Sequence, residues 1–69
     1  MKTLGEAIKI ARKQAGLTQK ELGELLGITG VTMGQWETGR RQPRVESLRK
    51  IADVLNVDFC FYFKPRHGK

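Results

Sequence analysis

Helix start and stop signals recur so closely along this chain that they allow only short helices. Gly16, Gly27 and Gly39 stand where apolar periodic segments end, and glycine readily takes the left-handed conformation that closes a helix. Thr3 and Thr18 are each followed three residues later by a glutamate. This is the spacing of a capping box, in which the two side chains satisfy backbone N–H groups at a helix start. The pattern therefore predicts a bundle of short helices.

Apolar residues at helical spacing indicate four such helices between Thr3 and Asn56. Thr29 can cap the third helix, and the fourth follows a loop that contains Pro43 and is expected to end at Asn56. The predicted buried stripes are, in chain order, Leu4, Ile8, Ala11 and Ala15; Leu22, Leu25 and Leu26; Met33 and Trp36; and Val45, Leu48, Ile51, Ala52 and Leu55.

The 69 residues are enough for one small domain, which must be held together by its helical core. Cys60 is the only cysteine and His67 the only histidine, so neither an internal disulfide nor a clustered metal site is available. The longest apolar run, VDFCFYF, is far shorter than the roughly 20 residues of a membrane helix. We therefore expect a cytoplasmic protein that needs no membrane, metal or cofactor. The chain also lacks the His/Asp/Glu constellation that an enzyme such as a small nuclease would need.

Positive charge predominates, with 13 Lys and Arg against 7 Asp and Glu, which gives a formal net charge of +6. Much of the excess lies between positions 40 and 50, in Arg40, Arg41, Arg44, Arg49 and Lys50. Such a concentration favours a polyanionic partner, of which DNA is the obvious candidate.

After Asn56 the apolar period changes from that of a helix to that of a strand. A single strand leaves backbone donors and acceptors unpaired, so we expect the same strand of a second copy to pair with it. The alternatives are a fifth helix, or an irregular tail that packs on the chain's own core. The predicted organisation is a helical domain, 1–56, and a dimerisation element, 57–69. The predicted dimer contacts are Phe59, Phe61, Tyr62 and Phe63.

Two short helices joined by a tight glycine-containing turn and followed by an arginine loop are what a helix-turn-helix requires. Residues 4–56 are similar to the phage-repressor and Cro-like family of helix-turn-helix regulators. The resemblance rests on Gly16-Leu17-Thr18-Gln19, Gly27-Ile28-Thr29, Trp36-Glu37-x-Gly39, Pro43 and Leu48-x-x-Ile51-Ala52-x-x-Leu55. It implies an all-α, λ-repressor-like bundle of four helices with a short C-terminal strand or fifth element.

Two departures from the family pattern have physical consequences. Gly23 replaces the family's alanine, which suggests a closer approach between the second and third helices. Arg44 replaces its serine or threonine cap, which weakens the start of the fourth helix by about 1 kcal/mol.

The third helix is the expected reading helix. Its spacing places positions 29, 33 and 36 inward. Gln35 can hold an adenine edge, and Val31 can pack on a thymine methyl. Thr29 and Thr32 can serve phosphates or base edges at the helix start. Gly30 and Gly34 would form a flat strip that lets the helix backbone lie close to the groove. The residues predicted to face outward are Gly30, Val31, Gly34, Gln35 and Thr38.

Further contacts flank this helix. Arg40, Arg41 and Arg44 are expected on phosphates, where they add affinity but little sequence choice. The resemblance implies that Gln19 touches the DNA backbone and braces the reading helix. It also implies that Arg12 pairs with Glu37 and fixes the first helix against the third.

The expected function is that of a dimeric, sequence-specific repressor on a two-fold-symmetric operator, with reading helices about 34 Å apart in successive major grooves. The chain also resembles the antitoxins of toxin–antitoxin operons, which would add a toxin protein as partner. An alternative is a protein-interaction module that uses the same bundle, with the aromatic strand as its binding edge. The basic loop favours DNA, because an interaction module gains nothing from it.

Overall fold

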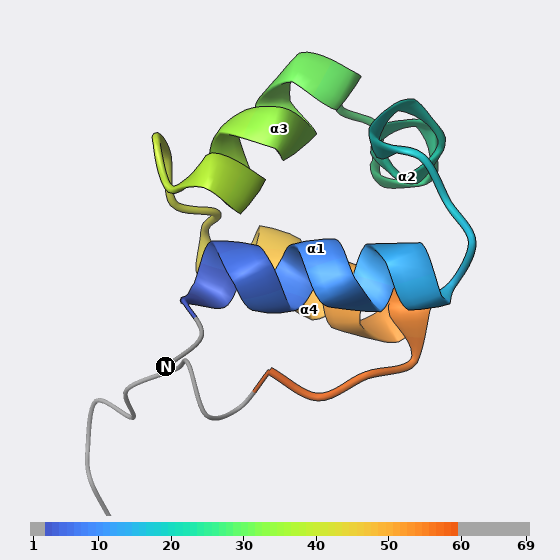
Figure 1. Ribbon diagram of the computed structural model, residues 1–69. Helices are drawn as coiled ribbons and strands as arrows, with labels where there is room; N and C mark the ends of the chain where they lie inside the picture. Colours follow the sequence, from blue (N-terminus) through green and yellow to red (C-terminus); the bar gives the residue numbers. More distant parts are fainter. Residues whose placement is uncertain (1–2, 60–69) are drawn as a thin grey trace, which may run out of the picture.

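A computed structural model describes residues 3–59 of the chain. Within this range the chain forms four α-helices and no strand: α1 (Leu4–Gln14), α2 (Gln19–Leu26), α3 (Gly30–Thr38) and α4 (Val45–Leu55). Figure 1 shows α2 and α3 on one side of α1, with α4 packed behind and below α1. None of these helices is both long enough and apolar enough to cross a membrane. The all-α helix-turn-helix bundle predicted from the sequence is confirmed.

Both predicted capping boxes are present. At the start of α1 the Thr3 hydroxyl accepts from the Glu6 N–H at 3.1 Å, and the Glu6 carboxylate accepts from the Thr3 N–H at 3.0 Å. Thr18 and Glu21 repeat the arrangement at the start of α2, at 3.0 and 2.9 Å. The two helix starts therefore have their first backbone donors satisfied by local residues.

Left-handed residues end the helical segments as predicted. Gly27 closes α2 with φ of 77°, and Gly39 closes α3 with φ of 83°. Asn56 ends α4 at φ of 56°, where an asparagine is among the residues that tolerate this conformation. The N-cap of α4 is Arg44, whose side chain makes no cap hydrogen bond, in keeping with the weak start expected there.

The centre of the core receives one fully buried large side chain from each helix: Ile8, Leu22, Met33 and Ile51. Trp36, Leu48 and Leu55 surround them. Three residues of the predicted stripes are exposed and lie outside this core: Ala15, Leu25 and Val45. Val45 is 52% exposed and is the first residue of α4.

Ala15 is exposed because it is the C-cap residue beyond the last turn of α1. Leu25 is 59% exposed, because one residue of helix turns it about 100° away from the half-buried Leu26.

The predicted C-terminal strand is wrong for the part of it that the structure describes. Residues 57–59 form no strand, and the Val57 N–H donates to the Ala52 carbonyl at 3.0 Å, so the chain turns back at the end of α4. Phe59 is 4% exposed and belongs to the core of its own chain, so it is not available as a dimer contact. The irregular-tail alternative holds for this residue, which packs into the core of its own chain without forming a strand. Phe61, Tyr62 and Phe63 lie outside the described residues.

Candidate nucleic-acid interface

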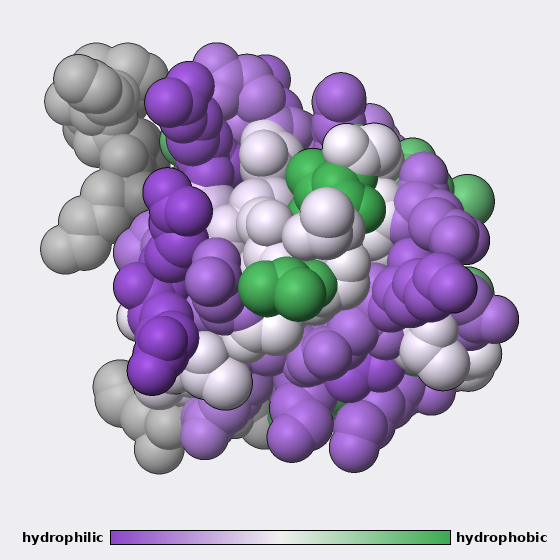
Figure 2. Space-filling view, turned by 90° about the horizontal axis from the view of Figure 1, so that it is seen from above, coloured by the Kyte–Doolittle hydropathy of each residue, from purple (hydrophilic) through white to green (hydrophobic). Residues whose placement is uncertain are grey.

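The outer face of α3 presents a small apolar and neutral surface. Val31 is 72% exposed, more than the other exposed large apolar residues of the described part of the chain, and Gln35 one turn later is half-buried. Figure 2 looks onto this side of the molecule and shows hydrophobic and pale residues in the middle, flanked by strongly hydrophilic ones. The arrangement combines an apolar contact with an amide that can hydrogen-bond, bordered by charge.

The first turn of α3 is ordered by its two threonines. The Thr29 hydroxyl accepts from the Thr32 N–H at 3.1 Å and donates to the Thr32 hydroxyl, also at 3.1 Å. Thr29 is exposed, whereas the spacing predicted that it faces inward. The reason is that an N-cap residue has extended backbone, here φ −86° and ψ 160°, so helical periodicity does not apply to it.

Thr38 closes the helix at its other end. Its hydroxyl donates to the carbonyls of Gly34 and Gln35, at 3.1 and 3.3 Å. Thr38 is exposed, as predicted, but its hydroxyl hydrogen is used in these hydrogen bonds within α3.

Gly30 and Gly34 face α2, so the prediction that they form an outward strip is wrong. A methyl group added at Gly30 would lie 3.3 Å from the backbone N and Cα of Lys20, closer than ordinary contact. One added at Gly34 would lie 3.5 Å from both amide atoms of Gln19. The glycines therefore let the first turn of α2 pack directly onto the backbone of α3.

Gly23, on α2, also allows a close approach between α2 and the start of α3. A methyl group there would come within 2.8 Å of the Ile28 carbonyl oxygen and 3.1 Å of the Thr29 carbonyl group. This agrees with the closer approach expected from glycine at a position where the family has alanine. The glycines on both helices thus hold the turn and the start of α3 tightly against α2.

A buried polar network fixes α3 against α1 and α2. The Arg12 guanidinium donates to both carboxylate oxygens of Glu37, from Nε at 2.5 Å and from Nη2 at 3.1 Å. Its Nη1 donates to the Leu17 carbonyl at 2.8 Å, and the Gln19 amide donates to Glu37 at 3.1 Å. Arg12 and Glu37 are each 7% exposed. The structure thus brings together the three residues that the resemblance assigned to bracing, with Glu37 in the interior instead of at the helix edge.

The arginine loop folds back along the C-terminal end of α3. The Arg41 N–H donates to the Gln35 carbonyl at 3.2 Å, and the Gly39 N–H donates to the Trp36 carbonyl at 3.3 Å. Arg40, Arg41 and Arg44 are all exposed. A shallow depression between α3 and α4 has as its lining Thr32, Trp36, Arg41, Gln42, Arg44 and Ser47. Two of the predicted arginines therefore lie beside a predicted threonine of α3.

The structure adds Lys20, which the sequence analysis did not single out. Lys20 lines a second open hollow together with Glu24, Ile28, Thr29, Gly30 and Val31. Its position directly after Gln19 was a possible signal, because neighbouring residues in the first turn of α2 share one end of the helix. A lysine on an exposed helix face is normally only solvated, so its residue type alone does not indicate a contact.

The chain is similar in sequence to a known family and to regulators from a bacterium and a phage. The helix-turn-helix family matches residues 8–62. The SPbeta prophage-derived HTH-type transcriptional regulator YonR of Bacillus subtilis is 32% identical over 65 residues, which cover 94% of this chain and 60% of YonR. Repressor protein C2 of Salmonella phage P22 is 33% identical over 61 residues, which cover 88% of this chain and 28% of the repressor. The chain thus spans between about a quarter and three fifths of these two relatives' length.

A solved structure agrees with these sequence matches. The crystal structure of the P22 c2 repressor protein in complex with a synthetic operator matches this fold with a TM-score of 0.83 and 28% identity. The match covers 93% of this chain and 97% of that chain. The relatives are named as transcriptional regulators and repressors rather than enzymes, in agreement with the non-enzymatic chain expected from the sequence. The chain belongs to the helix-turn-helix family, in its phage-repressor and Cro-like form.

Proposed function

We propose that the chain is a sequence-specific DNA-binding transcriptional regulator that acts as a repressor. The observation that carries the proposal is the outer face of α3, which exposes Val31 beside Gln35 on a helix held by the buried network of Arg12, Glu37 and Gln19. A reading helix must be fixed to within a fraction of an ångström for base contacts to discriminate, and this network supplies that rigidity. The likeness to an operator-bound repressor of phage P22 supports the same role.

In this proposal α3 lies in the major groove, and different residues contact the bases and the DNA backbone. Val31 packs on a thymine methyl, and the Gln35 amide holds a base edge, most simply that of adenine. The first turn of α3, with Thr29 and Thr32, and the neighbouring Gln19 serve the DNA backbone. Gly30 and Gly34 contribute indirectly, because they set how closely α2 lies against the reading helix.

The arginine loop supplies the sequence-independent part of the affinity. Arg40, Arg41 and Arg44 are exposed beyond the C-terminal end of α3, where they would meet phosphates bordering the groove. A positively charged loop folded against the end of a reading helix fixes the helix's register on the duplex. Repression follows most simply if the bound protein occludes a promoter.

A dimer on a two-fold-symmetric operator completes the proposal. One helix-turn-helix contacts few base pairs, and two copies about 34 Å apart would double the reading surface on the same side of the duplex. Phe59 takes no part, because it is buried in its own chain. The dimerisation element is then the segment after Phe59, with the side chains of Phe61, Tyr62 and Phe63 as the contacts.

An antitoxin role is a narrower form of the same proposal. It would add a toxin protein as a second partner and make the regulated genes those of the toxin–antitoxin pair. The relatives from a prophage and from phage P22 support a phage-type repressor instead. Purification of the chain after coexpression with the product of a neighbouring gene separates the two: a stable complex with a toxic protein supports the antitoxin form.

Selection of bound duplexes from a random pool tests the proposal. We expect the selected sequences to converge on two inverted half-sites whose centres lie one helical turn apart. Convergence on a single half-site would support sequence reading but remove the symmetric dimer. Retention of random duplexes without convergence would overturn the proposed function.

A further inference from the structure

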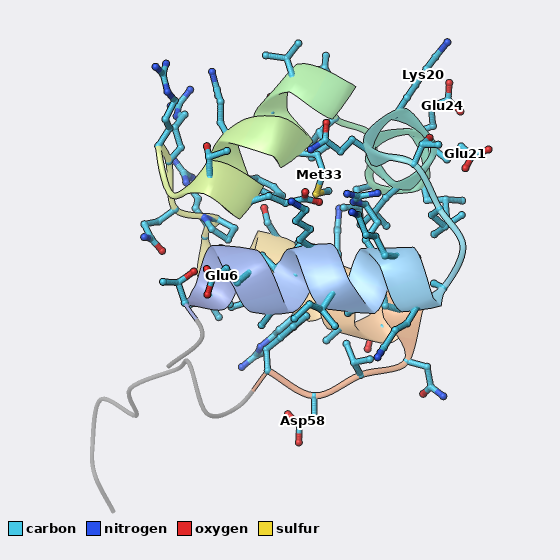
Figure 3. All side chains as sticks on the ribbon, viewed as in Figure 1. Glu6, Lys20, Glu21, Glu24, Met33 and Asp58 are labelled. Carbon is cyan, nitrogen blue, oxygen red and sulfur yellow. The ribbon has the colours of Figure 1, made fainter. Side chains whose placement is uncertain are left out.

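Lys20 lies at the N-terminal end of the reading helix, on the side of the molecule that carries α3. It is the second residue of α2 and is exposed. Figure 3 shows its side chain extending from α2 away from α1 and up to the level of α3, with its end directed away from the α3 ribbon, whereas Glu21 points to the flank of the bundle. The ammonium is therefore carried on the same side as the outer face of α3.

The backbone contact at Gly30 brings this lysine close to α3. The first turns of α2 and α3 touch there, since a methyl group at Gly30 would be 3.3 Å from Lys20 Cα and 3.6 Å from the Gln19 carbonyl carbon. Lys20 also shares an open, mainly apolar hollow with Thr29 and Val31. The Lys20 side chain therefore starts beside Thr29 and Val31, which are predicted to contact DNA.

Lys20 forms no ion pair with a carboxylate of the described residues. The ion pair between Arg12 and Glu37 lies in the interior of the bundle, whereas Lys20 is exposed. Glu24 lies one turn beyond Lys20 and lines the same hollow, yet the two side chains form no ion pair. Lysine placed N-terminal to glutamate at this spacing is the less favourable orientation on a helix. The Lys20 ammonium is thus available to an anion from outside the chain.

The position of Lys20 complements that of the arginine loop. Arg40 and Arg41 follow the C-terminal end of α3, whereas Lys20 borders its N-terminal end. A helix that lies in the major groove is bordered by the phosphates of both strands, so contacts to phosphates at both of its ends hold it in register. With the arginines alone, one border of the groove would lack a charged contact.

We propose that Lys20 binds a backbone phosphate of double-stranded DNA at the edge of the groove opposite the one that the arginine loop contacts. This assignment rests on the proposed DNA-binding function and adds to it a contact outside the predicted set. Lysine suits the role because it is a compact point charge on a flexible stem and fixes position without reading bases.

The test compares the salt dependence of DNA binding for Lys20→Gln and a matched variant, Arg49→Gln. Both remove one positive charge from an exposed helix position. Arg49 lies two residues after Ser47, about 200° around α4, and therefore faces away from the depression that Ser47 shares with α3. Affinities are measured by fluorescence anisotropy from 0.1 to 1 M salt on the selected operator and on a random duplex, after circular dichroism confirms that both variants are folded.

We expect Lys20→Gln to reduce the slope of log affinity against log salt by about 0.9, which corresponds to about an eightfold loss at 0.1 M salt that vanishes near 1 M. The loss should be equal on the two duplexes, and Arg49→Gln should keep the wild-type slope. An unchanged slope for Lys20→Gln, or an equal change in both variants, would overturn the phosphate contact. So would a loss confined to the operator, which would make Lys20 a base reader. If the wild-type protein preferred no duplex, the proposed sequence-specific function would fail, while the slope on the random duplex would still decide the role of Lys20.

Discussion

Replacement of Arg12 by methionine removes the centre of the network that holds the reading helix. The variant loses the donors to both Glu37 oxygens, at 2.5 and 3.1 Å, and to the Leu17 carbonyl, at 2.8 Å. It leaves a carboxylate whose side chain is 2% exposed without a countercharge. Loss of one member of a buried pair costs about 3–5 kcal/mol, and we expect about 3 kcal/mol here, because the Gln19 amide still donates to Glu37. Domains of this size have roughly 3–10 kcal/mol of stability, so the variant should be marginally folded at 25 °C.

Urea unfolding followed by tryptophan fluorescence measures this loss. Trp36 is the only tryptophan and lies buried on α3, so its emission reports the environment of the reading helix. Arg49→Met is the matched control: it removes an exposed arginine and should change the free energy of unfolding by less than about 0.5 kcal/mol.

A double variant, Arg12→Met with Glu37→Leu, separates the unpaired charge from the lost packing. It should recover most of the stability, although the Leu17 carbonyl and the Gln19 amide lose their partners. A loss below about 1 kcal/mol for Arg12→Met, the range of a solvent-exposed pair, would refute the conclusion that the network is buried and structural.

Three further changes test the packing and the assembly. Gly5→Ala should cost about 1–3 kcal/mol in urea unfolding, because the added methyl would lie 2.6 Å from the Trp36 carbonyl oxygen and 2.8 Å from the Glu37 carbonyl carbon. Gly34→Ala should instead stabilise by about 0.5–1 kcal/mol through helix propensity, since its nearest neighbours are atoms of a flexible side chain at 3.5 Å, and a loss would contradict that reasoning. Deletion of residues 60–69 should give folded monomers in sedimentation velocity, and persistent dimers would show that this segment is not the dimerisation element.

Features determined by neighbours in the sequence were predictable. The capping box of Thr18 and Glu21 and the left-handed Gly27 depend on residues within one turn, and the structure has them where the sequence placed them. The pairing of Arg12 with Glu37 spans 25 residues and could be inferred only through the family resemblance. Local spacing in the sequence thus predicted the helices, whereas the contact between Arg12 and Glu37 was predicted from the family resemblance.

Features that depend on which helix lies opposite were not predictable from periodicity. Gly30 was assigned to the outer face, yet it packs on α2, because a 3.6-residue period gives the angle between residues but not the direction of the neighbouring helix. Leu25 and Leu26 are chemically identical, and only the packed structure decides that the second faces the core. Phe59 fits a strand pattern and a core position equally well, and burial within its own chain was the outcome.

The central claim is that the outer face of α3 reads the sequence of DNA, and Gln35→Ala tests it most directly. The measurement is the ratio of affinities for the selected operator and a random duplex, compared between the variant and the wild-type protein at one salt concentration. A bidentate amide–base contact is worth about 1–3 kcal/mol of discrimination, so the ratio should fall by about 5- to 150-fold while the affinity for the random duplex stays the same. An equal loss on both duplexes, or no loss on either, would contradict the claim that this face discriminates between bases.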